Sequence, residues 1–407
     1  MSIAASRSLL SCLLRNSNKT YAKYLINVRF KSEHSDKKHA SNESNMIERA
    51  VLKKFSEKLH IESVDSPKKL QSTEVLIDVN YCALNGPDVL LCENLYSYKP
   101  KLPFVPGYEV CGKLVEISEG ARKAGFNVGD KVVALNKECF GGLAERCIAE
   151  VRDVWKIPSS IRSIDAVCLL EYYMTALIGL EQCASIDEED MVLINVGIGG
   201  IGLAAVDIAA NVYKAKVIGV GFSEDKAHKI RERGAFHAFS YKEKKLLKEI
   251  EEIAGDRDIK DIFEGDSGKH FKKVLDGFMN IYKSRTPSKH LLRDDNFGVV
   301  VQHLARDGKI IIAGTGHTSS DNEGKGDDRF TVTGISLKDY RKRKYELYRQ
   351  TGEDVISFFE EGLIKPVPSM IAGFYHINDA VKFISEMKHC GKVIIDIKQK
   401  DKEAKAQ

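Results

Sequence analysis

One glycine-rich stretch limits what this chain can fold into more than any other feature. Residues 193–212 read LINVGIGGIGLAAVDIAANV, an apolar run with a single formal charge, at Asp207. The length of the run would suit a membrane-spanning helix. Its closely spaced glycines and its aspartate argue against that interpretation, and we expect no membrane span in this protein.

The spacing of the glycines favours a nucleotide-binding turn instead. Gly197, Gly199 and Gly202 form a GxGxxG pattern directly after the apolar run 192–196 and directly before a stretch with helical periodicity. Such glycines permit a tight turn, close approach of the backbone to a pyrophosphate, and close packing of the helix on the strand. We therefore predict a dinucleotide-binding site that includes Gly197, Gly199, Gly200, Ile201 and Gly202.

The end of the next apolar run, at 215–221, distinguishes between NADH and NADPH. In NAD-binding folds an acidic side chain about 20 residues beyond the glycines holds the ribose hydroxyls. Gly221 stands at that position here, and Ser223 and Lys226 follow it as donors that suit a 2′-phosphate. Two acidic residues at 224–225 are explained by the first turn of a helix. The sequence favours NADPH as the cofactor.

The hydrophobic pattern changes along the chain. From about residue 175 to 338, short apolar runs alternate with amphipathic stretches, which is typical of βαβ units around a parallel sheet. The strand candidates are 191–197, 215–221, 237–241, 259–266, 309–316 and 330–337, with helix candidates at 202–213 and 224–233. Short alternating runs over 75–157 indicate a compact, mainly β domain. The expected fold class is α/β, a Rossmann-type doubly wound parallel sheet plus a mainly β domain.

The first 32 residues differ from the rest in composition. This segment is rich in serine, has no acidic residue before Glu33, and holds six basic residues: Arg7, Arg15, Lys19, Lys23, Arg29 and Lys31. A basic, acid-free start of this kind is typical of a mitochondrial transit peptide, although a disordered basic tail is an alternative. Residues 33–46 are polar and aperiodic, as expected for a spacer. We expect the mature protein in the mitochondrial matrix.

Charge and cysteine usage narrow the class of protein further. Removing the six basic residues of the first segment changes the formal net charge from +4 to −2, so nucleic acid is not an expected partner. The nine cysteines include no CxxC pair, which fits reduced thiols better than a disulfide framework. Segments 269–296 and 340–349 are dense in lysine and arginine, and we expect solvated surfaces there rather than binding patches.

Histidine is missing where a metal site or a general base would need it. No histidine occurs between His60 and His228, so the region of the N-terminal domain that should face the cofactor offers no histidine for a zinc site or for proton transfer. The expected chemistry is hydride transfer without a metal ion.

Several segments together resemble one known family. Residues 75–120, 126–135 and 141–145, followed by the glycine motif, resemble the zinc-independent quinone oxidoreductase branch of the medium-chain dehydrogenase/reductase superfamily. The resemblance covers about residues 47–398. It implies a GroES-like catalytic domain at 47–174, a Rossmann domain at 175–338, a C-terminal return to the catalytic domain at 339–398, and a frayed tail at 399–407.

This resemblance assigns catalytic positions in the first domain. Asn85 stands where the alcohol dehydrogenase branch has a zinc-binding cysteine, and Tyr108 and Glu109 stand at its His-Glu pair. Tyr96 matches a tyrosine that lines the quinone pocket. Negative charge grows on the acceptor oxygen as hydride arrives, so we expect the Asn85 amide and the Tyr96 hydroxyl to stabilise it. Asn85 also suits a turn cap, Tyr96 also suits a wedge between domains, and Asp88 suits a structural role.

The resemblance extends the cofactor site as well. Thr175 matches a threonine that borders the nicotinamide, while Lys226 and Tyr241 match residues that contact the 2′-phosphate in NADPH-using relatives. Gly314, in the strand candidate 309–316, completes the predicted cofactor-binding residues.

The implied function is an NADPH-dependent reductase of quinones or related conjugated carbonyls. The resemblance also implies a homodimer through the strand candidate 330–337, which would otherwise leave an exposed sheet edge. Two alternatives stay open. One is a 2-enoyl thioester reductase in which Lys99 and Lys101 meet a carrier phosphate. The other is a non-catalytic NADPH-binding redox sensor or scaffold.

Overall fold

The computed structural model describes most of the chain that follows the predicted spacer. The described residues are 46–96, 99–184, 186–197, 199–240, 249–250, 252–253, 259–265, 304–313, 330–386 and 388–400. The predicted presequence, the segment 269–296, Tyr241 and Gly314 lie outside them.

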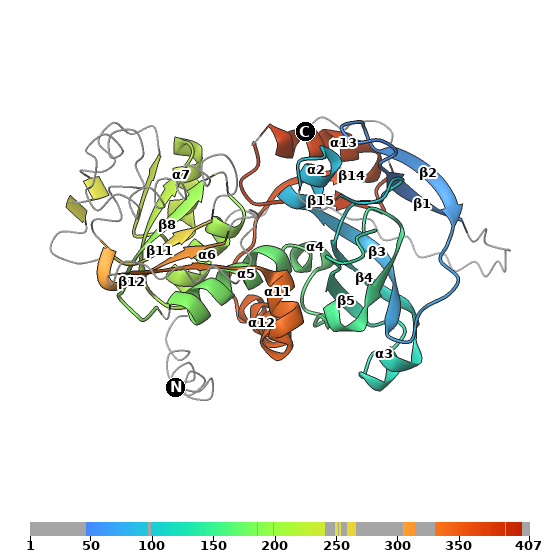
Figure 1. Ribbon diagram of the computed structural model, residues 1–407, viewed down its shortest axis with the longest axis horizontal. Helices are drawn as coiled ribbons and strands as arrows, with labels where there is room; N and C mark the ends of the chain where they lie inside the picture. The colour runs from blue at the N-terminus through green and yellow to red at the C-terminus, as the bar shows by residue number, and fades with distance from the viewer. Residues whose placement is uncertain are drawn as a thin grey trace, which may run out of the picture. The chain divides into compact units, whose positions relative to one another are not determined.

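In the described part of the chain, six parallel strands form one sheet in the order β10-β9-β8-β11-β12-β13. Their bounds are β8 Met191–Gly197, β9 Lys216–Gly221, β10 His237–Ser240, β11 Ile259–Glu264, β12 Leu304–Ile312 and β13 Phe330–Gly334. Counted along the chain this is the order 3-2-1-4-5-6 of the Rossmann fold. Helices α6 (Ile201–Asn211) and α7 (Glu224–Glu232) make the first two crossovers (Figure 1). The predicted doubly wound sheet is confirmed.

A second, mainly antiparallel sheet combines strands from both ends of the described chain. Its path is β14-β15-β3-β4-β5-β7, with β6 also paired to β3. The bounds are β3 Glu74–Leu84, β4 Glu109–Ile117, β5 Lys131–Leu135, β6 Arg146–Glu150, β7 Val154–Lys156, β14 Pro368–Gly373 and β15 Lys392–Asp396. Because β15 pairs with β3, the residues at its start lie beside the end of β3, where α2 (Gly86–Cys92) begins.

Shorter elements complete the two parts. A two-stranded sheet joins β1 (Met46–Val51) to β2 (His60–Asp65). The remaining helices with described bounds are α3 Glu119–Lys123, α4 Ser163–Ala166, α11 Leu337–Arg343, α12 Tyr345–Glu360 and α13 Ile377–Ser385, with 3-10 turns η1 Val151–Asp153 and η5 Phe374–His376. Of the helices described, none has the length and apolar character that crossing a membrane requires.

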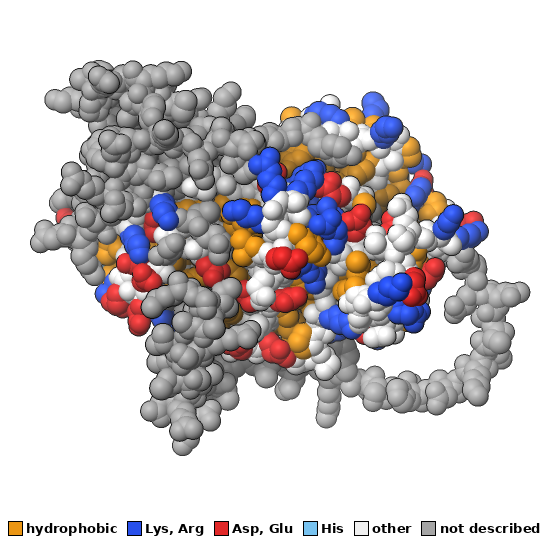
Figure 2. Space-filling model, turned by 60° about the horizontal axis from the view of Figure 1, so that its bottom comes forward, with side chains coloured by type: hydrophobic (Ala, Val, Ile, Leu, Met, Phe, Trp, Pro, Cys, Tyr) orange, Lys and Arg blue, Asp and Glu red, His pale blue; other side chains and the backbone are white. Residues whose placement is uncertain are grey.

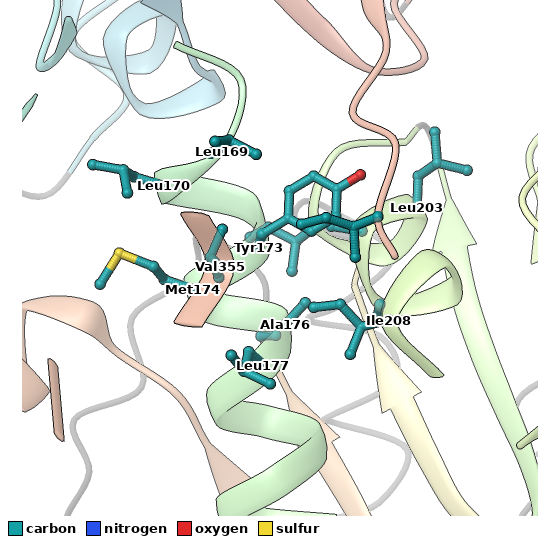
Figure 3. Packing of buried hydrophobic residues seen from close by; sticks show 14 of the residues in the cluster. Leu169, Leu170, Tyr173, Met174, Ala176, Leu177, Leu203, Ile208 and Val355 are labelled. Atoms are coloured by element: carbon teal, nitrogen blue, oxygen red, sulfur yellow. The ribbon is translucent and has the colours of Figure 1, made fainter. Parts of the chain in front are cut away.

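A buried helical segment at 170–184 connects the two sheets along the chain. It consists of a π-helical turn η2 (Leu170–Met174), a short α5 (Thr175–Leu177) and a second π-helical turn η3 (Ile178–Ala184). Its side chains pack in one cluster with Leu203 and Ile208 of α6 and with Val355 of α12 (Figure 3). A helix that is apolar on nearly every side is one that is buried on every side, and this burial fixes the position of the polar residues it carries.

The expectation that residues 340–349 form a solvated helix face is wrong in part. Arg341 is buried, and its guanidinium donates to Asp153 Oδ1 at 2.6 Å and to Glu150 Oε2 at 2.6 Å. Tyr348 is also buried, and its hydroxyl donates to Asp153 Oδ1 at 3.2 Å. The basic composition of the segment gives no sign of acidic partners nearly two hundred residues earlier in the chain, and for that reason the sequence was misleading.

Charges of both signs are mixed on one face of the described surface. On the face in Figure 2, lysine and arginine side chains lie among aspartate and glutamate side chains. This face lacks the continuous basic stripe that marks a nucleic-acid-binding surface.

Candidate functional site

The glycine motif forms the turn between β8 and α6. Gly197, Gly199 and Gly200 have φ angles of 57°, 129° and 71°, a region that side-chain-bearing residues rarely occupy. Gly202 faces the end of β8, where an added Cβ would lie only 2.6 Å from Val196 Cα. Gly200 is the N-cap of α6, and no side chain caps that end in the described structure. The turn therefore has the form of a pyrophosphate cradle at a helix N-terminus.

Three of the residues predicted to select NADPH come together at the end of β9. Gly221 pairs with Gly197 of β8, so this position lies at the same edge of the sheet as the glycine turn. Ser223 is the N-cap of α7, and Lys226 lies in the first turn of that helix. Glu224 and Asp225 are exposed, as first-turn residues without a ligand would be. In this fold the ribose 2′ position lies at the end of the second strand, next to these residues.

A segment from the C-terminal part packs against both features. A Cβ on Gly199 would lie 2.9 Å from Cys390 Cα, and Lys226 Nζ donates to the carbonyl oxygen of His389 at 3.1 Å. The adjoining cavity is lined partly by Tyr172, Gly200 and Lys392 and has an empty volume of about 260 Å³, its mouth included. Ligand pockets usually reach roughly 300–1,000 Å³, so this cavity by itself is smaller than a usual ligand pocket.

Asn85 lies in a buried polar network at the start of α2. Its amide nitrogen donates to Glu109 Oε2 at 3.0 Å, and its amide oxygen accepts from Lys392 Nζ at 2.8 Å. Its backbone N–H donates to Asp88 Oδ2 at 3.0 Å. Both ends of the amide are therefore engaged within the protein. This geometry makes Asn85 a capping and positioning residue, and it does not favour the expected direct contact with an acceptor oxygen.

Lys392 is the residue of this network that sequence reasoning missed. Its ammonium lies 2.7 Å from Glu109 Oε2, with the two side chains 1% and 0% exposed, and 3.4 Å from the centre of the Tyr172 ring. A buried ion pair is stable only where further hydrogen bonds satisfy both charges, and the backbone N–H of Glu171 donates to Glu109 Oε1 at 3.0 Å. Glu109 is the first residue of β4 and Lys392 is the first residue of β15, and no local feature of the sequence showed that these two charges would pair.

This ion pair occupies the positions where the resemblance places a metal in other branches. The Lys392 ammonium contacts Asn85 and Glu109, the equivalents of zinc-site positions. Among the residues that the structure describes, no group of three or more His, Cys, Asp and Glu side chains is placed to hold a metal ion. A fixed positive charge thus stands at this point of the catalytic domain.

A second, partly buried ion pair lies beside Tyr108. Lys137 Nζ is 2.7 Å from Glu171 Oε1 and 5.0 Å from the centre of the Tyr108 ring. Tyr108 is completely buried, and its hydroxyl has no hydrogen-bond partner in the described structure. Burial, with a smaller contribution from the Glu171 charge, raises the pKa of Tyr108 well above its usual value, so the hydroxyl remains protonated. The partly buried Tyr96 packs against the same hydrophobic cluster.

Two further predicted positions have local structural partners. The Thr175 hydroxyl donates to the Glu171 carbonyl oxygen at 2.7 Å within the buried helical segment. Asp88 accepts from the backbone N–H groups of Asn85 and Gly107, at 3.0 and 2.9 Å, which agrees with its expected structural role. Burial raises the pKa of Asp88 to about 7. Tyr241 and Gly314 lie outside the described residues.

Comparisons with known proteins identify the family. Residues 71–159 match the model of the alcohol dehydrogenase GroES-like domain. A quinone oxidoreductase-like protein 2 homolog of Nematostella vectensis is 30% identical over 364 residues, covering 86% of this chain and 89% of that protein. The chain belongs to the quinone oxidoreductase family. It is therefore an oxidoreductase of the medium-chain dehydrogenase/reductase superfamily, and the resemblance described above is confirmed.

Similar proteins agree on the fold. The mouse quinone oxidoreductase-like protein 2 is 27% identical over 86% of this chain and 92% of its own. The crystal structure of Escherichia coli quinone oxidoreductase complexed with NADPH matches with a TM-score of 0.67 at 20% identity, over 86% of this chain and all of that one. The structure of CurK enoyl reductase matches with a TM-score of 0.70 at 20% identity, over 86% of this chain and 99% of that one. The GroES-like domain and the Rossmann domain of the expected fold class are thus both confirmed.

Proposed function

We propose that this protein is an NADPH-dependent, zinc-independent reductase of quinones or related conjugated carbonyls. The observation that carries the proposal is the end of β9, where Gly221 replaces an acidic residue and the buried Lys226 follows within one helical turn. An acidic residue at Gly221 would repel a 2′-phosphate, whereas an ammonium attracts one. A relative of the same family, from Escherichia coli, has been solved with NADPH bound.

The residues present fit the cofactor at its pyrophosphate and at its 2′-phosphate. At Gly202 helix α6 packs so closely on β8 that no Cβ fits, and the uncapped N-terminus of α6 offers N–H donors to the pyrophosphate. Ser223 and Lys226 would hold the 2′-phosphate. When bound, NADPH supplies the hydride, and the protein supplies position and charge.

The catalytic domain supplies the charge that the reaction requires. Hydride transfer leaves negative charge on the acceptor oxygen, and fixed donors or cations that face it lower the barrier. The Tyr96 and Tyr108 hydroxyls are the donors we propose, with the Lys392 ammonium as a nearby fixed cation. Asn85 and Glu109 hold that ammonium in place through contacts of 2.8 and 2.7 Å. A proton taken up with the hydride completes the reduction of a quinone to a hydroquinone.

Two further properties belong to this proposal. The basic, acid-free segment 1–32 supports import into the mitochondrial matrix. Strand β13 is the last strand of the described six-stranded order, and an unpaired edge of this kind supports a homodimer formed by edge pairing.

A substrate panel tests the proposed activity. Protein that begins at Glu33 is mixed with NADPH and, in turn, with 9,10-phenanthrenequinone, an aliphatic enone, a 2-enoyl thioester and no acceptor, and loss of absorbance at the nicotinamide band is followed. We expect oxidation with the quinone and the enone. Turnover with the thioester alone would replace the proposal with the enoyl reductase alternative, and tight binding without turnover on any acceptor would leave a sensor or scaffold.

A further inference from the structure

His389 lies in the segment that packs on the cofactor site, and the fold gives its imidazole no function. The side chain is 7% exposed, and its Nδ1 atom is buried without a hydrogen-bond partner in the described structure. Burying a polar nitrogen without a partner is costly, and such atoms in native proteins usually have a reason. Neither the glycine motif nor the residues near the end of β9 pointed to this position.

The position of His389 is fixed from two sides. On one side, its carbonyl oxygen accepts from Lys226 Nζ at 3.1 Å, so the residue faces the first turn of α7. On the other side, Cys390 lies against the glycine turn, 2.9 Å from where a Cβ of Gly199 would be. His389 therefore stands at the end of β9, between the part of the site that suits the pyrophosphate and the part that suits the 2′ position.

The charges that surround this segment are positive. Burial raises the pKa of the Cys390 thiol, while Lys229, Lys226 and Arg233 act in the opposite direction, as nearby cations do. Burial and the charge of Lys226 lower the pKa of His389 to about 4, so the imidazole is neutral at physiological pH. The cations beside this segment favour a phosphate monoester over a ribose hydroxyl, and the neutral imidazole can offer that phosphate an N–H donor.

We propose that His389 donates a hydrogen bond from Nδ1 to the 2′-phosphate of NADPH and, with Lys226, determines the preference for NADPH over NADH. This inference rests on the proposed use of NADPH. In the conformation described, the His389 carbonyl oxygen accepts the hydrogen bond from Lys226 that the phosphate would take. Entry of the cofactor exchanges that contact for two contacts to the phosphate, one from each side chain.

The test measures binding of two nucleotides that differ only in the 2′-phosphate. Calorimetry compares 2′,5′-ADP with 5′-ADP for the wild type and for two variants of similar side-chain size, His389→Leu and His389→Asn. Leucine removes the donor, whereas the asparagine amide keeps an N–H donor close to the position of Nδ1. We expect His389→Leu to weaken 2′,5′-ADP binding about 10-fold or more, because losing one hydrogen bond to a charged group usually lowers affinity by at least that factor. The affinity of His389→Asn should stay within about 3-fold of the wild type. Affinity for 5′-ADP should not change, which also verifies the fold of each variant.

The outcomes separate this inference from the proposed function. A wild type that prefers 2′,5′-ADP, together with a His389→Leu variant that shows the same preference, overturns the role of His389 and leaves the cofactor assignment intact. A wild type that binds both nucleotides equally overturns both. If His389→Leu does not fold, His389→Gln replaces it. The glutamine amide lies nearer the position of Nε2 than that of Nδ1, so we expect the same loss of affinity for 2′,5′-ADP as for leucine.

Discussion

At the scale of single residues, burial and hydrogen bonding conflict at the Tyr108 hydroxyl. The ring is held by an edge contact with Phe140, with ring centres 5.7 Å apart, and by the Lys137 ammonium 5.0 Å from its centre. The hydroxyl contributes nothing to this packing, since it has no partner in the described structure. An unpaired buried polar group costs about 1–3 kcal/mol. We propose that the hydroxyl is retained as a donor to the acceptor oxygen.

Tyr108→Phe is therefore expected to keep or raise the melting temperature while lowering kcat with a quinone about 100-fold, the usual cost of removing one oxyanion donor. Thermal unfolding and steady-state kinetics measure the two effects. Tyr375→Phe is the matched control, because that hydroxyl donates to Glu48 at 3.0 Å, away from the network around Tyr108. An unchanged kcat in Tyr108→Phe would remove Tyr108 from the mechanism.

The unusual pKa of His389 makes a prediction about stability. The group titrates near 6.5 when unfolded and at about 4 when folded, so the unfolded chain binds more protons between these values. The free energy of unfolding should fall as pH decreases from about 6.5 to 4, by up to about 3 kcal/mol from this group. Urea unfolding at pH 7.5 and at pH 5 should show a smaller pH effect in His389→Asn than in the wild type.

The wild type has to be compared with His389→Asn because Asp88 changes the free energy of unfolding with pH in the opposite direction. Its pKa is raised to about 7 by burial, so the folded state binds the extra proton and this contribution to stability is lost as pH rises through 7. An identical pH dependence in wild type and His389→Asn would show that His389 is not a buried neutral imidazole.

At the scale of elements, the glycine turn combines unusual backbone angles with close contacts. Gly202→Ala places a Cβ 2.6 Å from Val196 Cα, a backbone atom that has no room to shift. We expect a loss of roughly 1–3 kcal/mol in stability, as for other overpacked sites, and weaker binding of NADPH and 5′-ADP alike. Chemical denaturation and calorimetry measure these. Gly86→Ala is the control, since nothing lies within 4 Å of its added Cβ; equal losses in both variants would contradict the packing argument.

The sequence predicted some elements well and others poorly, for physical reasons. Apolar runs of strand length and the GxGxxG spacing located β8, α6, β9 and α7, because each depends on residues close in sequence. The π-helical turns at Leu170–Met174 and Ile178–Ala184 had no local signal, since the first follows from packing on α6 and α12 and the second from packing on β11 and β12. The partners of Asn85 were hidden for the same reason, because Lys392 is 307 residues further along the chain.

At the scale of the whole described chain, the helices that follow the Rossmann strands pack against the catalytic sheet through an ion pair and an aromatic contact. Arg341 of α11 is paired with the buried Asp153, which stands just before β7. Trp155 of β7 packs edge-on against Tyr348 of α12, with ring centres 5.4 Å apart. The Cβ of an alanine at Gly352 would lie 2.4 Å from the Trp155 ring, so this contact also depends on a glycine.

Arg341→Met leaves the Asp153 carboxylate buried without its cation, and we expect a loss of about 3–5 kcal/mol in unfolding free energy. The double variant Arg341→Met with Asp153→Asn removes both charges and should recover part of that loss. Urea denaturation of the two single variants and the double variant gives the coupling energy. Additive effects would show that the two side chains do not form a stabilising pair.

The central claim is that the end of β9 selects NADPH, and one kinetic comparison tests it most directly. With 9,10-phenanthrenequinone as the acceptor, kcat/KM is measured for NADPH and for NADH in the wild type, in Lys226→Glu and in Lys382→Glu, an equal charge change on the exposed side of α13. We predict that the wild type prefers NADPH, that Lys226→Glu lowers kcat/KM for NADPH at least about 10-fold while that for NADH stays nearly unchanged, and that Lys382→Glu behaves as the wild type. A wild type that uses NADH as well as NADPH, with no response of their ratio to Lys226→Glu, would contradict the claim.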